Sequence, residues 1–232
     1  MPTIANAPSK KMPSERIFFT TMSLTMLAFI FIGFAPSFYL RGVIHPYHPM
    51  APLNLVVFLH GLAFSAWVIL FAVQTGLVAS GNVHIHRRLG PVGVVLVALM
   101  LPLALLVAIG GIHRPHSGPA GIPPLSWLAV PLINIPLFAG LVIAALLKRR
   151  MPVAHKRLML IAMVSIMGPA FGRIPVPPPI GGLFALVALL TLLIPLIVWD
   201  WRTRGRVHPA TAWGSATVLL GAVLPAIVWK SG

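Results

Sequence analysis

The stretch PLNLVVFLHGLAFSAWVILFAVQTGLVAS (residues 52–80) contains no Lys, Arg, Asp or Glu. A helix needs about 20 predominantly apolar residues to cross the hydrocarbon core of a bilayer, which is roughly 30 Å thick. This stretch is long enough, and its few polar residues are isolated among apolar ones. It therefore predicts a transmembrane helix.

The rest of the chain repeats this pattern. Of its 232 residues, 58% are hydrophobic and only 8% are charged, whereas a soluble domain carries about 25% charged residues. So few charges cannot cover a surface that faces water, so lipid must replace water over most of it. We predict an all-α bundle of about seven transmembrane helices, over the runs Ile17–Leu40, Pro52–Ser80, Leu89–Ile109, Leu125–Leu147, Leu158–Phe171, Ile180–Trp199 and Trp213–Trp229.

Two of these runs need comment. The fifth reaches spanning length only if it begins near Val153 and includes the basic turn at His155. The first is too long for the core of a signal peptide and lacks a convincing cleavage site, so we interpret it as an uncleaved helix. Residues 1–16 are then a cytoplasmic basic tail, and residues 17–232 form a single seven-helix transmembrane domain.

The basic residues predict the orientation. Thirteen of the 17 Lys and Arg residues fall in the N-terminal tail and in the segments 81–88, 148–157 and 200–208. The alternate segments hold one each, namely Arg41, Arg114, Arg173 and Lys230. Because short cytoplasmic loops are enriched in Lys and Arg, we expect the N-terminus inside and the C-terminus outside.

The net charge of +15 has the same explanation. In a soluble protein it would suggest nucleic acid, but here the basic residues are scattered between apolar spans. We therefore expect contact with anionic lipids and no nucleic-acid binding. The chain has no cysteine, which excludes thiolate metal ligands, iron–sulfur clusters and covalently attached haem.

Polar residues inside the spans are candidates for function. His60, Phe64, Trp67, Phe71 and Gln74 recur at spacings of four and three, so they share one face of the second helix. One interpretation is hydrogen bonding between helices that fixes their packing. The other is a polar pocket facing the bundle axis.

The pocket interpretation takes two residues of this stripe and two from elsewhere in the chain, of which Asn134 falls near mid-membrane. Those we assign to it are Trp67, Gln74, Asn134 and Arg173.

Two histidines occur in matching contexts, His86-Arg-Arg-Leu and His155-Lys-Arg-Leu, each opening a helix that runs outward. They should lie at one depth, where two imidazoles can supply the axial ligands of a b-type haem. Arg87 and Arg157 could then pair with its propionates, and His60 would face an outer pocket. The alternative is that these basic groups only touch lipid phosphate and set the orientation.

The outer loops contain a further group of candidate metal ligands. Imidazoles at His45, His48, His113 and His116, with His60 below them, could ligate Zn, Cu or Fe. No carboxylate is available on that side, and a loop rich in Pro often contains His without such a role. We also expect no Asp or Glu within any span, because Asp200 is assigned to a loop; this disfavours a proton- or sodium-coupled transporter.

The segments LHGLAFSAWVILFAVQ (59–74), HRRLGPVG (86–93), HKRLMLIA (155–162) and TRGRVHPAT (203–211) together resemble an uncharacterised family of bacterial multi-pass membrane proteins. The resemblance covers nearly everything after the N-terminal tail and implies a bacterial inner-membrane location, without an activity. A looser similarity to b561-type haem cytochromes rests on histidines at helix ends in a small bundle.

These observations favour a redox-type membrane protein that binds haem b or quinone. A non-catalytic accessory subunit of a larger membrane complex is the first alternative. The second is a carrier of an apolar or anionic small molecule that uses Arg173. Sequence alone leaves the three open, and it does not decide whether the protein is an enzyme.

Overall fold

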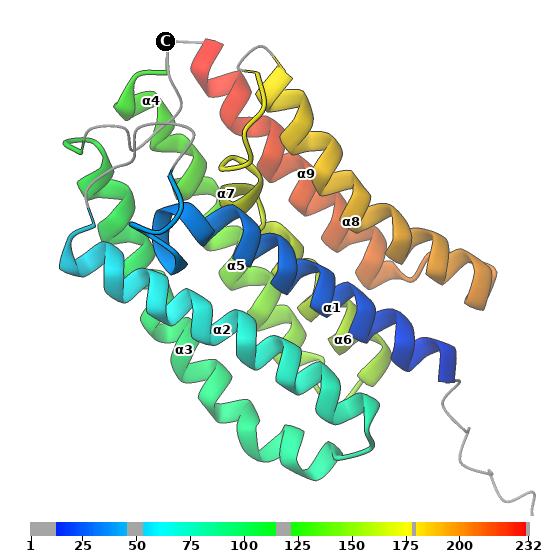
Figure 1. Cartoon of the computed structure of the whole chain (residues 1–232). Coiled ribbons are helices and arrows are strands. Elements are labelled where there is room, and N and C mark those ends of the chain that lie inside the picture. The colour runs from blue at the N-terminus through cyan, green and yellow to red at the C-terminus, as the bar shows by residue number, and fades with distance from the viewer. Residues whose placement is uncertain (1–12, 46–52, 115–121, 178–179, 231–232) are drawn as a thin grey trace, which may run out of the picture.

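The computed structural model describes residues 13–45, 53–114, 122–177 and 180–230, and in this part of the chain the secondary structure is helical (Figure 1). The helices are α1 (Pro13–Phe34), a π-helical turn η1 (Ala35–Tyr39), α2 (Leu55–Ala79), α3 (Val83–Gly111), α4 (Pro124–Trp127), α5 (Ala129–Leu147), α6 (Pro152–Ser165), α7 (Gly168–Phe171), α8 (Gly181–Arg204) and α9 (Pro209–Lys230).

Six spans, in which η1 continues α1, α4 precedes α5 and α7 follows α6, are long and apolar enough to cross a membrane. The 22-residue α9 is a further long helix beside them. The protein is therefore an all-α, multi-pass integral membrane protein, as predicted.

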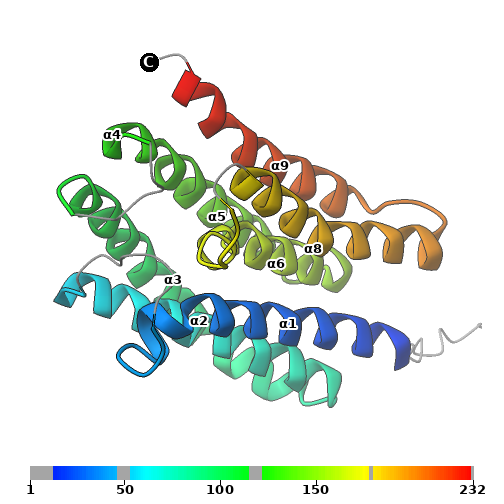
Figure 2. The same cartoon turned by 45° about the horizontal axis from the view of Figure 1, so that its top comes forward.

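The long helices lie side by side and alternate in direction (Figures 1 and 2). The starts of α1, α3, α6 and α9 all lie at one end of the bundle, which we call the basic end because it carries the Arg- and Lys-rich connections. The other end, where α1 and α3 finish, we call the distal end. The segments rich in Lys and Arg thus lie at one end of the bundle, and the segments with a single basic residue lie at the other.

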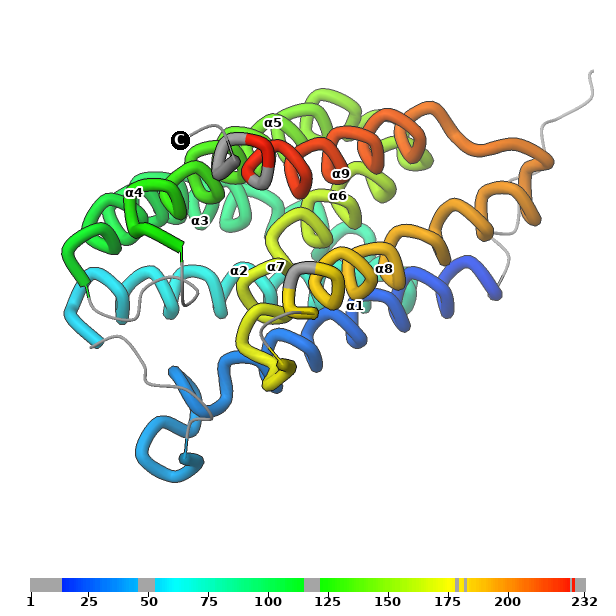
Figure 3. Tube along the Cα trace, turned by 90° about the horizontal axis from the view of Figure 1, so that it is seen from above, coloured from blue at the N-terminus to red at the C-terminus, as the bar shows by residue number. Residues whose placement is uncertain are grey.

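The span formed by α6 and α7 lies in the middle of the bundle (Figure 3). Some 61% of its most apolar 18-residue window is buried, against 6% for α3. Because its neighbours are protein rather than lipid, this span needs fewer apolar side chains than the others. That is why it was the weakest run in the sequence. The span begins at Pro152, next to Val153, and includes His155, as it had to do to reach spanning length.

The central span is broken between α6 and α7. Pro169 has no N–H group, so it cannot continue the hydrogen-bond ladder to the carbonyl of Ser165. The backbone tightens before it, with the N–H of Met167 donating to the carbonyl of Val164 at 3.1 Å. The short α7 then reaches α1 at Gly33, where a Cβ atom would lie 2.4 Å from the carbonyl oxygen of Ala170.

One helix end differs from the prediction. We expected the sixth run to end at Trp199 and Asp200 to begin a loop, but α8 continues to Arg204. It stops at Gly205, which adopts a left-handed conformation with φ of 68° and whose N–H donates to the carbonyl of Trp201. Asp200 therefore lies within a helix that belongs to a membrane span, and the expectation that no span contains an acidic residue was wrong.

Candidate functional site

His86 and His155 meet at the basic end of the bundle. His86 lies in the first turn of α3 and His155 in the first turn of α6. Their ring centroids are 6.3 Å apart and the ring planes are inclined at 74°. The two matching sequence contexts thus bring two imidazoles from separate helices to one depth.

Some polar atoms at this histidine pair have hydrogen-bond partners and others do not. His155 Nδ1 lies 2.8 Å from the carbonyl oxygen of Ala145, so that nitrogen carries the proton and Nε2 keeps a lone pair. Gln74 Nε2 donates to the carbonyl oxygen of His86 at 3.2 Å. His86 Nδ1 and Gln74 Oε1 are both buried and have no hydrogen-bond partner within the described part of the chain. Such groups are costly unless a ligand or water satisfies them.

Space is available beside His86. One turn further along α3, a Cβ atom added at Gly90 would meet no atom within 4 Å. Within the described residues no group of three or more His, Asp or Glu side chains is close enough to share a metal ion. The site therefore offers two nitrogen ligands, together with the amide of Gln74.

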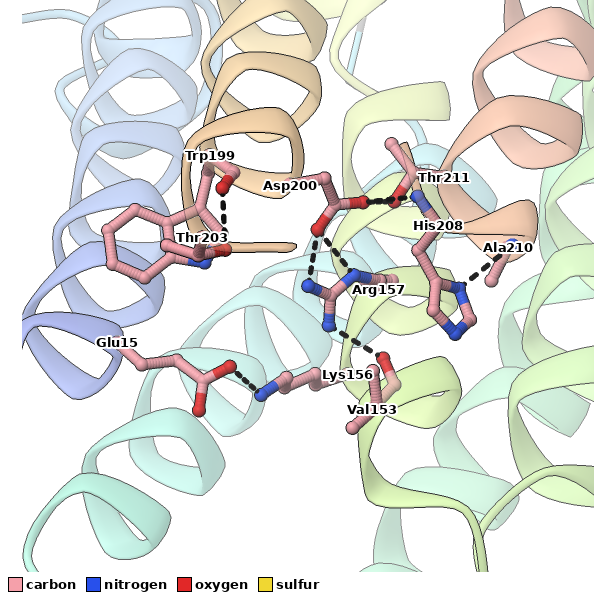
Figure 4. A network of polar contacts seen from close by, with 10 residues as sticks. All are labelled: Glu15, Val153, Lys156, Arg157, Trp199, Asp200, Thr203, His208, Ala210 and Thr211. Atoms are coloured by element: carbon pink, nitrogen blue, oxygen red, sulfur yellow. Dashed lines mark hydrogen bonds and ion pairs between the residues drawn. The ribbon is translucent and has the colours of Figure 1, made fainter. Parts of the chain in front are cut away.

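Next to the pair, α6 contributes a buried ion pair (Figure 4). The side chains of Arg157 and Asp200 are 1% and 0% exposed. Arg157 Nε donates to Asp200 Oδ1 at 2.8 Å, its Nη2 contacts the same oxygen, and Nη1 donates to the carbonyl of Val153 at 2.9 Å. The guanidinium that the sequence analysis assigned to a haem propionate is thus engaged by protein groups.

The second carboxylate oxygen of Asp200 joins α8 to α9. It accepts a hydrogen bond from the Thr211 hydroxyl at 2.5 Å and one from the backbone N–H of His208 at 3.1 Å. His208 Nδ1 in turn accepts from the N–H of Ala210 at 3.0 Å, so its ring caps the start of α9. Burial lowers the pKa of His208, and the nearby Arg157 and Arg204 lower it further.

Sequence reasoning missed this network. The available signal was that Asp200 is one of only two acidic residues, beside Glu15, in a chain with 17 basic ones. Glu15 itself pairs with Lys156, at a more exposed position near the start of α1. Both acidic side chains therefore hold basic residues of α6 at the basic end.

The second-helix stripe faces the interior, as predicted. Trp67 and Phe71 are 3% and 9% exposed. Trp67 Nε1 donates to the sulfur of Met163 at 3.1 Å, and its ring meets Phe138 edge-on. The polar group of Trp67 is thus satisfied by packing against α6.

The residues assigned to one pocket lie in separate places. Gln74 belongs to the histidine pair, and Trp67 lies in the core. Asn134 donates to the carbonyl of Val130 in its own helix at 2.9 Å. Arg173 lies at the distal end, with its guanidinium carbon 4.3 Å from the centroid of the Phe34 ring.

The predicted outer histidines are only partly described. His48 and His116 fall outside the described residues, whereas His45 and His113 are exposed at the distal end. His60 lies in the second turn of α2 beside Phe64, and its Nδ1 is buried without a partner among the described residues.

The fold and these sites define a multi-pass helical membrane protein with an imidazole pair at the basic end and Arg173 beside an aromatic ring at the distal end. Comparison of the chain with protein-family models, curated proteins and solved structures finds no match.

Proposed function

We propose that this protein is a redox protein of the bacterial inner membrane that binds haem b between His86 and His155. The observation that carries the proposal is the 6.3 Å separation of the two imidazole centroids on separate helices. A metal about 2 Å from one nitrogen of each ring would set the ring centroids about 6 Å apart. The observed separation fits that arrangement.

The number of ligands supports a macrocyclic cofactor. Two imidazoles leave most of a metal's coordination sphere unfilled, and within the described residues no third ligand approaches them. A porphyrin brings the remaining nitrogens itself, and when bound it supplies one-electron transfer.

The hydrogen bonding of His155 is also typical of a histidine that binds a metal. Metal-binding histidines usually donate their other ring N–H to a carbonyl or carboxylate, which fixes the ring and raises its basicity. The Ala145 carbonyl has this relationship to His155 Nδ1. Because Arg157 is engaged by Asp200, we assign the propionate contact to Arg87, whose side chain is exposed at the same end of the bundle.

A quinone is the second candidate for the same place. The unpartnered buried Gln74 Oε1 is an acceptor for a quinol hydroxyl, and His86 Nδ1 can donate to or accept from a quinone oxygen according to its tautomer.

The test is the absorbance spectrum of protein purified from cells supplied with a haem precursor, oxidised and then reduced with dithionite. We expect reduction to sharpen the visible bands. His86→Ala and His155→Ala should abolish these bands or convert them to a high-spin form, because each removes one axial ligand. His84→Ala is the matched control, since His84 is exposed two residues before His86 on the same helix.

The outcomes separate the candidates. A colourless wild-type protein overturns the haem proposal, and a co-purifying quinone that is lost in His86→Ala and Gln74→Leu would then support the second candidate. If the purified protein contains neither haem nor quinone, the result would favour the alternative of a non-catalytic accessory subunit. Haem bands that survive in both histidine variants would mean that the ligands lie elsewhere.

A further inference from the structure

Three basic side chains gather at the distal end, far along the bundle from the histidine pair. They are His60 near the start of α2, Arg114 just after α3 and Arg173 just after α7, and we call them the distal basic cluster. Arg114 and Arg173 lie within electrostatic range of each other and of His60. Arg173 is an exposed residue, and its guanidinium carbon lies 4.3 Å from the centroid of the Phe34 ring.

The protein supplies no carboxylate side chain to this cluster. The chain has only two acidic residues, Glu15 and Asp200, and they pair with Lys156 and Arg157 at the basic end. The two guanidinium groups of Arg114 and Arg173 repel each other, and such repulsion at the edge of a membrane is relieved when an anion binds between or beside them. The missing negative charge must therefore come from outside the side chains of this protein.

The hydrogen bonds at the cluster are also incomplete. Arg114 Nε and His60 Nδ1 are buried and have no partner in the part of the chain that the structure describes. Arg173 Nη1 donates a hydrogen bond to the carbonyl oxygen of Pro169 at 2.7 Å. The guanidinium of Arg173 lies over the ring of Phe34. The ring of Phe34 is next to that of Phe64, which is next to His60, so aromatic rings connect Arg173 with His60.

A groove opens from the same arginine. It has a volume of about 420 Å³, and its lining combines apolar side chains with two basic ones. The apolar lining residues include Ile32, Pro36, Ile44 and Ile174, and the basic ones are His45 and Arg173. A groove with an apolar wall and a basic head suits a ligand with the opposite arrangement of an apolar chain and an anionic head.

We propose that the distal groove binds an anionic amphiphile, with its oxyanion head on Arg173, where the charge of Arg114 adds to the attraction, and its apolar chain along the isoleucine-lined wall. The head group is a carboxylate or a phosphate ester, because both accept charge-assisted hydrogen bonds from guanidinium groups. A free fatty acid and an anionic phospholipid share this chemistry. The proposal does not depend on the haem proposal, since the two sites have no residue in common.

The test uses the full-length protein purified in an uncharged detergent, with bound molecules counted by native mass spectrometry. The probes are palmitate, phosphatidylglycerol, phosphatidylcholine and inorganic phosphate. We expect palmitate, phosphatidylglycerol or both to bind at least tenfold more tightly than phosphatidylcholine. Binding of palmitate alone would identify the fatty acid as the source, and binding of phosphatidylglycerol alone would identify the lipid.

Variants assign the binding to the cluster. Arg173→Gln should weaken binding about tenfold, as expected for the loss of one charge-assisted hydrogen bond. Arg114→Gln removes a neighbouring positive charge that is not part of the groove lining, so it should weaken binding by a smaller factor. Arg173→Lys keeps the charge and should lose less. Arg88→Gln is the matched control, because it removes one exposed arginine at the opposite end. If Arg173→Gln does not fold, Arg114→Gln and Arg173→Lys still decide the question.

Three results would overturn the proposal. The first is equal binding of phosphatidylglycerol and phosphatidylcholine with no binding of palmitate, since the head-group charge would then be irrelevant. The second is unchanged affinity in Arg114→Gln and Arg173→Gln. The third is inorganic phosphate binding as tightly as the amphiphiles, which would leave no role for the groove.

Discussion

Arg157 of α6 and Asp200 of α8 form an ion pair in which both side chains are almost fully excluded from solvent. Asp200 also binds Thr211 and the backbone of His208, so one carboxylate joins α6, α8 and α9 at the basic end (Figure 4). The same α6 carries His155, two residues before Arg157. This ion pair therefore fixes the helix that presents half of the imidazole pair.

Replacing Asp200 with Asn should strongly destabilise the protein. The change leaves the charge of Arg157 buried without a counter-charge, which typically costs about 3–5 kcal/mol. We expect a cost near the lower end of this range, because the Asn oxygen still accepts one hydrogen bond from Arg157. The measurement is the thermal unfolding temperature in detergent.

Glu15→Gln is the matched control for that variant. Glu15 and Lys156 also form an ion pair, but their side chains are 27% and 26% exposed. Water and ions screen such a pair, so its loss should cost no more than about 1 kcal/mol. An equal drop in unfolding temperature for both variants would contradict the structural role assigned to Asp200.

The stability of the start of α9 should depend on pH through His208. Burial and nearby arginines lower its pKa in the folded protein below the ordinary 6.5, so the unfolded chain binds the proton first as the pH falls. The stabilisation from neutral His208 is thus complete above about pH 6.5 and is lost as the pH falls through its lowered pKa. Unfolding temperatures measured from pH 7.5 to pH 5 should show this decline.

His208→Asn isolates that effect. Asn is among the best residues at a helix N-cap, so it can accept the hydrogen bond from Ala210 without titrating. The variant should therefore lose less stability than the wild type between pH 7.5 and pH 5. The same slope in both proteins would assign the pH dependence to other histidines.

Close packing of α7 on α1 should make Gly33 intolerant of a side chain. In Gly33→Ala the new Cβ would lie 2.4 Å from the carbonyl oxygen of Ala170, so one backbone must move. We expect a loss of about 1–3 kcal/mol, as for overpacking in general. Gly140→Ala is the control, because a Cβ there meets no atom within 4 Å, and it should leave the unfolding temperature unchanged or raise it. Equal tolerance at the two positions would show that α7 does not pack against α1 in this way.

The proposed orientation can be tested with reporter fusions at the C-terminus. Eleven of the Lys and Arg residues that the structure describes belong to segments of the basic end, so that end should face the cytoplasm. The C-terminus follows α9 at the opposite end, and an alkaline phosphatase fused there should be active while green fluorescent protein stays dark. The reverse pair of results would place the basic end outside or remove one crossing.

The sequence by itself determined the class of the protein. Long runs without charge admit only helices in a bilayer, because every backbone polar group must be satisfied within its own segment. The repeated His-basic-basic-Leu contexts also placed His86 and His155 at one depth, since each opens a helix that starts at the same end. Local pattern was sufficient for these conclusions because both follow from the position of a residue along a single helix.

Only the tertiary structure decided which helices are neighbours. Helix length and periodicity do not say that α6 runs through the centre, that Asp200 faces Arg157, or that Arg114 and Arg173 gather near His60. Asp200 was assigned to a loop because an acid near the end of an apolar run looks solvent-exposed when its partner, 43 residues away in the chain, is not known. A buried charge is stable only beside its counter-charge, and that proximity is a property of the packed bundle.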